Sequence, residues 1–255
     1  SGVQAARMIG ARGIFDTDDG RSVGVHYWAA APFAHWVTAP DCLDEPLGRR
    51  SVRYPSYKAL AYLHPDVFAP NPQVNVSIGL QVGEPYALLR LVAHDASHDR
   101  GAVGLSIEHS HRLIGLLEGD MRVFVSAEGQ LDASLKDREL RIPPETMHDV
   151  LAGARIVVGD SQSVIAEAAV LGTPAVRVNS YTGATPYLVE LEEKYGLAFS
   201  FTPAAFDEAI ALVSSLVAEA STGTEWSRRR DRMLEDKVNL TEWYIRFLTD
   251  LESTE

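Results

Sequence analysis

Apolar and polar positions follow two different periods along this chain. Short apolar runs, typical of buried strands, alternate with longer segments in which apolar residues recur at helical spacing. The strands expected from the short runs are 13–15, 35–38, 86–93, 121–126, 155–159, 175–178 and 197–201. The helices expected from the longer segments are 3–9, 106–118, 145–152, 163–171, 185–195, 203–218, 225–235 and 240–251.

The order of these elements predicts an α/β fold. Strands that alternate with helices are expected when crossover helices cover a parallel sheet. From residue 86 onward the elements suffice for a complete doubly wound, Rossmann-like parallel sheet with a helical tail. Before residue 41 they are too few to close a sheet, and segment 41–53 carries Pro46 and Gly48 among charges, which is typical of a connector.

The order of the elements predicts that the chain has two parts. Residues 1–52 are expected to be the remnant of an N-terminal α/β domain with its connector, because the chain opens with Ser1-Gly2 and runs at once into a helix. Residues 53–255 are expected to form the Rossmann-like domain and its C-terminal helices. No apolar run reaches the ~18 residues of a membrane span, and no signal peptide is visible.

The composition narrows the class of protein. Of 255 residues 46% are apolar and 23% charged, as in ordinary globular proteins. A net charge of −12 disfavours a nucleic-acid or anionic-membrane binder, since such binding depends on clustered Lys and Arg. Cys42 is the only cysteine, which excludes an intramolecular disulfide and a Cys-based structural zinc site. These features predict a cytoplasmic protein.

The turn 159–163, which reads Gly-Asp-Ser-Gln-Ser, carries the clearest chemistry. It follows a predicted strand and opens a helix, where open α/β sheets bind ligands and where free N–H groups favour an anion such as a diphosphate. Glu167 lies one turn further on the same helix face and is placed to accept the hydroxyls of a ribose. The alternative is a simple N-cap followed by a solvated glutamate. The candidate binding residues here are Asp160, Ser161, Gln162, Ser163 and Glu167.

A second segment, 86–101, is an apolar strand that ends in a dense polar loop. Arg90 is unusual within a buried strand and is expected to reach a carboxylate or a phosphate. We expect the loop to contact phosphate through Asp95, Ser97 and His98. Two alternatives are a loop that satisfies its own polar groups and a metal site. The metal site would use His94, Asp95, His98 and Asp99.

Three further positions are candidates for the same site. Glu128 ends another predicted strand at the same sheet edge, and His148 lies on the helix before the 155–159 strand, where it could approach a base or a phosphate. A solvated loop residue and an ordinary core or surface histidine are the alternatives. The acidic loop that contains Asp18 and Asp19 provides the candidate general base, although acidic turns are usually only solvated.

Together these segments resemble an uncharacterised microbial family of glycosyltransferase-like proteins of GT-B architecture. The stretches that carry the resemblance are 54–65, 90–99, 125–129, 144–149, and 159–163 through 171–174. More distantly, Asp160-Ser161 with Glu167 is similar to the UDP-binding turn of UDP-N-acetylglucosamine 2-epimerases, with Gln162-Ser163 in place of two glycines. The resemblance implies a GT-B C-terminal-type domain, with Tyr57 and Lys58 at the interdomain cleft and a last helix that crosses back to the N-terminal half.

The function predicted from these features is transfer of a sugar from a nucleotide sugar, expected to be a UDP-sugar, to an unknown acceptor. No metal or organic cofactor is expected, because a helix N-terminus and hydrogen-bond donors can neutralise the leaving diphosphate. Three alternatives remain: a UDP-sugar 2-epimerase, a metal-dependent phosphohydrolase that uses the 94–99 loop, and a non-catalytic nucleotide-sugar sensor.

Overall fold

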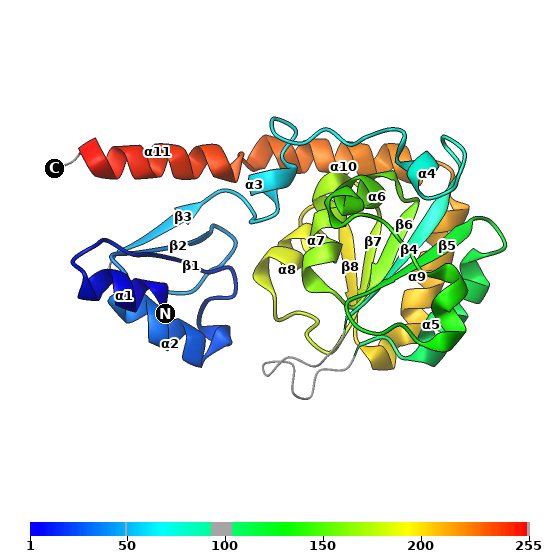
Figure 1. Cartoon of the computed structure of the whole chain (residues 1–255), viewed down its shortest axis with the longest axis horizontal. Helices are drawn as coiled ribbons and strands as arrows, with labels where there is room; N and C mark the ends of the chain where they lie inside the picture. The colour runs from blue at the N-terminus through cyan, green and yellow to red at the C-terminus, as the bar shows by residue number, and fades with distance from the viewer. Residues whose placement is uncertain (49, 93–103, 254–255) are drawn as a thin grey trace.

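The computed structural model describes residues 1–48, 50–92 and 104–253, and within them the strands form two parallel sheets. The smaller sheet has the order β1-β2-β3 and the larger has the order β5-β4-β6-β7-β8. Figure 1 shows the two sheets in separate lobes, with helix α11 lying across the smaller one. The predicted α/β class is therefore confirmed.

The N-terminal lobe, residues 2–54, is built around the smaller sheet. Its elements are α1 (Gly2–Met8), β1 (Ile14–Asp16), the 3-10 helix η1 (Gly20–Val23), α2 (Val25–Ala30), η2 (Ala31–Phe33), β2 (Trp36–Pro40) and β3 (Ser51–Tyr54). Tyr27 on α2 packs with Val37 and Ala39 of β2 in a small buried cluster. This sheet was not predicted to be complete, because β3 lies in the segment expected to be a connector.

The C-terminal lobe, residues 60–236, contains the larger sheet and most of the helices. Its strands are β4 (Tyr86–Leu91), β5 (Arg122–Ala127), β6 (Ile156–Gly159), β7 (Ala175–Val178) and β8 (Ala198–Phe201). Its helices are α3 (Leu60–Leu63), α4 (Val74–Ser77), α5 (Ile107–Leu117), η3 (Ala133–Arg138), η4 (Pro144–Thr146), α6 (Met147–Gly153), α7 (Gln162–Leu171), α8 (Pro186–Glu193), η5 (Pro203–Ala205), α9 (Phe206–Ala218) and α10 (Thr222–Asp236).

Side chains of the larger sheet alternate between two buried layers, as the pleat of a strand requires. In β6, Val157 joins a core with α6, α7 and α8, whereas Ile156 and Val158 join a second core with α5 and α9. Helices therefore cover both faces, which is why most positions of these strands are apolar, on both faces rather than at every second residue; Arg90 in β4 and Arg177 in β7 are charged exceptions. The doubly wound arrangement predicted for this region is confirmed.

The chain reverses direction within the larger sheet between β4 and β6. From β4 it moves outward to β5 and then returns to place β6 on the other side of β4. Such a switch point leaves a crevice outside the carboxyl ends of the two strands, and ligands of open α/β sheets bind there. Gly159, which ends β6, lies opposite Arg90 of β4 at this position.

Helix α11 (Leu240–Ser253) returns from the C-terminal lobe and packs on the smaller sheet. The Trp36 and Phe247 rings lie 6.1 Å apart, and the Tyr244 hydroxyl donates to Asp16 Oδ1 at 2.7 Å. The crossing of the last helix that the resemblance implied is therefore present. Within the described residues, no helix combines the length and the apolar composition needed to cross a bilayer.

The division of the chain at residues 52 and 53 stays a prediction. That boundary falls inside β3, whose register pairs Val52 with Thr38 and Arg53 with Ala39 of β2. The short strand was missed because polar Ser51 and Arg53 alternate with apolar residues over only four positions. Helix α2 was also not predicted, since its six residues are too few to establish a helical period.

The close packing of β6 on β4 gives a first testable prediction. A Cβ atom at Gly159 would lie 2.4 Å from the Arg90 carbonyl oxygen, a backbone atom that a strand in mid-sheet holds in place. We expect Gly159→Ala to lower the free energy of unfolding by about 1–3 kcal/mol, as for other overpacked sites. Denaturant unfolding measures this change.

Gly115→Ala is the matched control. Gly115 lies within α5, and a Cβ atom there would meet nothing within 4 Å. Because alanine is the better helix former, this variant should be more stable by roughly 0.5–1 kcal/mol. A Gly159→Ala protein as stable as wild type would show that β4 and β6 are not held at this spacing.

Candidate functional site

The turn before α7 is held by the buried carboxylate of Asp160. Its Oδ1 accepts the N–H of Val92 at 2.8 Å, and its Oδ2 accepts the N–H of Leu105 at 3.2 Å. The Asp160 carbonyl also accepts a bond from Asn179 Nδ2 at 2.8 Å. Asp160 therefore joins the end of β4, the start of α5 and the loop after β7. Its observed contacts hold the backbone of these segments in place.

The three polar residues that follow Asp160 have different surroundings. Ser161 is buried and caps α7, its Oγ accepting the N–H of Val164 at 3.5 Å. Gln162 accepts a bond from the Thr185 hydroxyl at 2.6 Å, which ties α7 to the start of α8. Ser163 is exposed, with its Oγ 3.4 Å from that of Ser161. The first N–H groups of α7 have no partner within a helix, and Ser163 is the side chain of this turn that is open to a ligand.

Glu167 is partly buried and paired, not a solvated helix residue. The Tyr62 hydroxyl donates to Glu167 Oε1 at 2.8 Å, and His148 Nε2 lies 3.8 Å from the same oxygen. The Tyr62 and His148 rings are 5.3 Å apart and inclined by 34°. Two residues singled out from the sequence, Glu167 and His148, are thus brought together by a third, Tyr62, which was not.

The acidic loop after β1 places three carboxylates in different surroundings. Asp16 accepts bonds from Thr38 and Tyr244, and Asp18 Oδ1 accepts one from Lys58 Nζ at 2.8 Å. Burial raises the pKa of Asp19, and the neighbouring charge of Asp18 raises it further, while Lys58 acts in the opposite direction. The pKa of Asp19 therefore lies above the ordinary value of an aspartate.

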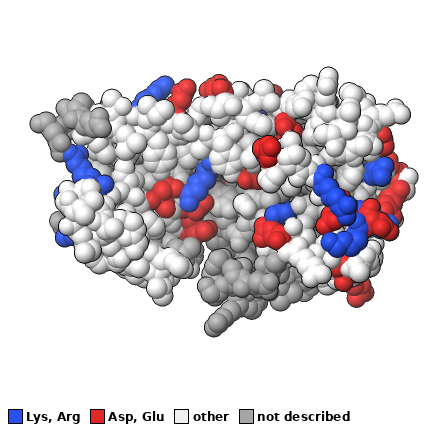
Figure 2. All heavy atoms as spheres, in the orientation of Figure 1, with Lys and Arg blue, Asp and Glu red and all other residues white. Residues whose placement is uncertain are grey.

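A short segment connects the acidic loop to helix α7. Lys58 pairs with Asp18, and Tyr62, four residues later, binds Glu167. Tyr187 at the start of α8 has Asp18, Asp19 and Tyr62 in its electrostatic surroundings. We call this region, with Asp18, Asp19, Lys58, Tyr62 and Tyr187, the interlobe junction. Figure 2 shows acidic side chains with a basic one among them between the ends of β1 and β2 and helix α8.

Arg90 lies at the carboxyl end of β4 and reaches a carboxylate, one of the two partners expected for it. Its Nη1 donates to Ser126 Oγ at 2.7 Å and its Nη2 to Glu128 Oε1 at 3.0 Å. Arg90 and Glu128 therefore form one group at the edge of the crevice. Whether they bind a ligand stays a prediction.

The polar loop after β4 lies outside the described residues. It contains the candidate phosphate contacts Asp95, Ser97 and His98, and the alternative metal ligands His94 and Asp99. The three interpretations of this loop, as a phosphate contact, a self-satisfied loop or a metal site, therefore stay predictions.

A buried ion-pair network lies between the two lobes. Lys237, 2% exposed, places its Nζ 2.7 Å from Asp41 Oδ1 and 2.9 Å from Glu190 Oε2, and the Tyr57 hydroxyl donates to Glu190 at 2.6 Å. Asp41 follows β2, Glu190 lies on α8, and Lys237 follows α10. Tyr57 is therefore buried at the boundary between the lobes, as implied, but its observed partner is a protein carboxylate.

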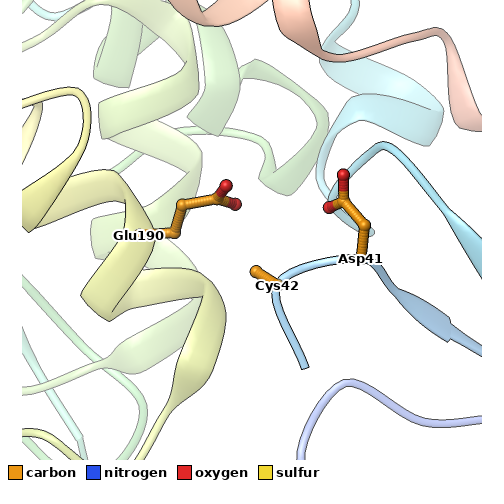
Figure 3. Close-up of side chains that lie close together, drawn as sticks. All are labelled: Asp41, Cys42 and Glu190. Atoms are coloured by element: carbon orange, nitrogen blue, oxygen red, sulfur yellow. The ribbon is translucent and has the colours of Figure 1, made fainter. Parts of the chain in front are cut away.

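Cys42 lies beside this network, and its sulfur together with Asp41 and Glu190 has the spacing of a metal-ligand set (Figure 3). Burial raises the pKa of the Cys42 thiol to about 12, and Glu190 adds to that effect, so the thiol stays protonated and is a poor metal ligand. The Lys237 ammonium already supplies the positive charge between the two carboxylates. We interpret the group as an ion pair that joins the lobes.

Sequence reasoning missed Tyr62, Lys237 and Tyr187. The spacing of Lys58 and Tyr62, four residues apart, was a usable signal, because it places both on one side of a helical turn. Lys237 gave no such signal, since its partners Asp41 and Glu190 are distant in sequence.

The fold and the turn before α7 together define a class: an α/β protein with the GT-B glycosyltransferase fold. No family model or curated protein matches the sequence. The likeness rests on solved structures at 11–15% identity, which shows the fold alone. The resemblance to GT-B-like proteins drawn from the sequence is confirmed at that level.

Three of these solved structures are a putative epimerase and two glycosyltransferases. The putative UDP-N-acetylglucosamine 2-epimerase from Listeria monocytogenes gives a TM-score of 0.64 at 11% identity, covering 99% of this chain and 70% of that one. Spinosyn forosaminyltransferase SpnP gives 0.56 at 15% identity, covering 97% and 72%. Glycosyltransferase SsfS6 from Streptomyces sp. SF2575, complexed with thymidine diphosphate, gives 0.54 at 13% identity, covering 98% and 66%. This chain thus spans about two thirds of the length of such proteins.

The interlobe ion pair gives a second prediction. Lys237→Met should lower the free energy of unfolding by about 2–3 kcal/mol at neutral pH, because it removes the buried cation of Glu190 and leaves only Lys194, half exposed and 3.7 Å away. The loss should stay below that of a fully buried pair, since the Asp41 side chain is 42% exposed. Chemical denaturation measures it. Lys136→Met, which breaks an exposed pair with Glu139, is the control and should cost about 0.5 kcal/mol or less.

The stability difference between wild type and Lys237→Met should depend on pH in a defined direction. Burial raises the pKa of Glu190, but bonds from Tyr57 and Lys237 outweigh it, so the pKa of Glu190 lies below its ordinary 4.5. A carboxyl whose pKa is lower in the folded than in the unfolded state stabilises the fold at any pH above its unfolded-state pKa. This stabilisation is lost as the pH falls through the folded-state pKa. The gap between wild type and Lys237→Met should therefore narrow below about pH 4.5. A constant gap would contradict the pairing.

Proposed function

We propose that this protein is a GT-B-like glycosyltransferase that binds a pyrimidine nucleoside diphosphate sugar, with UDP as the nucleotide. The observation that carries the proposal is the position of Glu167, one turn after the exposed start of α7 and joined by Tyr62 to the junction with the acidic loop. A diphosphate at the first N–H groups of α7 would place a ribose beside that carboxylate. A neighbour with the same fold was solved with thymidine diphosphate.

Donor binding uses the C-terminal lobe. Ser163 and the first N–H groups of α7 hold the diphosphate, because a helix N-terminus carries partial positive charge. Glu167 accepts hydrogen bonds from the ribose hydroxyls and His148 lies beside it, 3.8 Å from the same oxygen. The helix dipole and hydroxyl donors stabilise the diphosphate as it leaves.

The acceptor is activated from the N-terminal lobe. Asp19 takes the proton of an acceptor hydroxyl as that oxygen bonds to C1 of the sugar, and the bond from C1 to the diphosphate oxygen breaks with release of UDP. Asp19 suits this role because its pKa is raised by burial and by Asp18, which brings the carboxyl nearer to the working pH. Asp18 is held by Lys58 and orients the loop.

Epimerisation of the sugar at C2 is the second candidate, favoured by the TM-score of 0.64 to the putative 2-epimerase. It requires acid and base residues on both faces of C2. Incubation with UDP-N-acetylglucosamine separates the two reactions: transfer to water or an acceptor releases UDP, whereas epimerisation returns an intact UDP-sugar with altered stereochemistry at C2. If neither product forms but UDP still binds, the protein is a non-catalytic nucleotide-sugar sensor.

Glu167→Ala tests donor binding. It removes charge-assisted hydrogen bonds to the ribose, so UDP affinity should fall about tenfold to a hundredfold. Affinity for inorganic pyrophosphate, which has no ribose, should be unchanged. Calorimetric titration gives both values, with Glu235→Ala, an exposed glutamate on α10, as the control.

The stability of the same variant separates a binding role from a structural one. Alanine is the better helix former and Tyr62 is 45% exposed, so the melting temperature should hardly change. Unchanged UDP affinity with a sharply lower melting temperature would make Glu167 a structural residue.

Asp19→Asn tests the general base. The release of UDP from the donor should slow by a factor of about 10²–10⁴, while UDP affinity stays the same, because the amide cannot accept the proton. Asp44→Asn, at an exposed position, is the control. Because Lys58 lowers the pKa of Asp19, Lys58→Met should move the acid limb of the pH–rate profile to higher pH. A limb that stays in place would remove Asp19 from this role.

A further inference from the structure

Arg177 in β7 is the largest fully buried side chain of the described protein. None of its surface is exposed, and its Nε, Nη1 and Nη2 atoms have no hydrogen-bond partner among the described residues. Its neighbours in the sheet are small: Gly159 on β6 and Ser200 on β8. The described residues therefore provide no counter-charge that is hydrogen-bonded to this side chain.

Such an arrangement is costly in a folded protein. A guanidinium keeps its charge even when buried, and its five donors lose their bonds to water. Burial accordingly lowers the pKa of Arg177, with Tyr187 and Glu192 acting weakly in the opposite direction. Lys237 shows the usual solution, since it is also buried but bonds to Asp41 and Glu190. Arg177 has no such partner within residues 1–48, 50–92 and 104–253, and an anion from outside the chain would supply one.

The position of Arg177 indicates which anion. Val176 and Val178 join the core with α5 and α9, so the alternation of the strand places Arg177 on the face covered by α7 and α8. On that face it lies in the strand next to Gly159, directly before the turn that opens α7. The charges of Arg177, Asp18 and Asp19 all act on the pKa of Tyr187, a residue of the interlobe junction.

We propose that Arg177 binds the diphosphate of the nucleotide sugar, so that the leaving group is held between its guanidinium and the start of α7. This inference rests on the proposed function, and it adds a guanidinium to the helix N-terminus of the donor site. The planar fork of a guanidinium matches two phosphate oxygens, which suits a diphosphate better than a single hydroxyl. Because Arg177 is fully covered, binding requires side chains to shift, and Tyr187, which neighbours both Arg177 and the junction, is the candidate to move.

The test uses the full chain and the variant Arg177→Met, with two measurements of opposite expected sign. Without ligand, the variant should melt higher by about 2 °C or more, because an unpaired buried charge is replaced by an apolar side chain and no partner is orphaned. Its affinities for inorganic pyrophosphate and UDP should fall about tenfold to a hundredfold. Its affinity for uridine, which has no phosphate, should stay the same.

Arg122→Met is the matched control, since it removes the same charge from an exposed position at the opposite end of the sheet. It should leave both the melting temperature and the anion affinities unchanged. Arg177→Lys, which keeps the charge without the fork, should bind pyrophosphate with intermediate affinity.

Each outcome separates this inference from the function on which it rests. Equal UDP affinities of wild type and Arg177→Met would overturn the role of Arg177, while the proposed nucleotide site would still be supported. Pyrophosphate binding that depends on Arg177, without any nucleotide binding, would support the anion site and count against the proposed function. Binding of neither ligand by wild type, or a lower melting temperature for Arg177→Met, would show that Arg177 is structural.

Discussion

One buried ammonium holds the two lobes in register. Lys237 joins Asp41, which follows the second strand of the smaller sheet, to Glu190 on α8 of the larger lobe. Since Tyr57 bonds to the same glutamate, the segment that leaves the smaller sheet is fixed at the same point. The distance between the acidic loop and α7, and with it any chemistry shared between the lobes, depends on this contact.

The charged groups of the junction fall into two kinds. Lys58 and Lys237 are each shared by two carboxylates. Lys58 pairs with two aspartates of the N-terminal lobe, whereas Lys237 lies between one carboxylate from each lobe. Arg177 is of the other kind, since it is buried without a partner among the described residues. Paired charges stabilise the ligand-free fold, whereas an unpaired one is typical of a site that is complete only with a ligand.

The larger sheet could be predicted from the sequence because its strands are buried on both faces. Runs such as the one through Val157 and Val158 are apolar at every position and need no partner to be recognised. Strand β3 could not be predicted in this way, because Ser51 and Arg53 gain their strand conformation from pairing with β2, not from a local pattern.

The residues of the candidate site also differ in whether the sequence could reveal them. The turn at Ser163 and the glutamate at 167 were found because their relation is local, a helix start and one turn of helix. Tyr62 and Lys237 were not found, because each acts on a residue more than a hundred positions away or on one in another lobe. Their partners are set by the fold and cannot be deduced from spacing.

The carboxylates of the acidic loop show how the fold assigns roles to neighbouring identical groups. Lys58 Nζ lies 2.8 Å from Asp18 Oδ1 and 3.4 Å from Asp16 Oδ2, so these two carboxylates are paired with one cation. Asp19 is partly buried beside the charged Asp18, and both effects raise its pKa. A single lysine from the segment between the lobes thus pairs with two of the three carboxylates and leaves Asp19 as the proposed proton acceptor. That lysine lies four residues before Tyr62, which binds Glu167, so one turn of the chain joins the proposed general base to the proposed ribose contact.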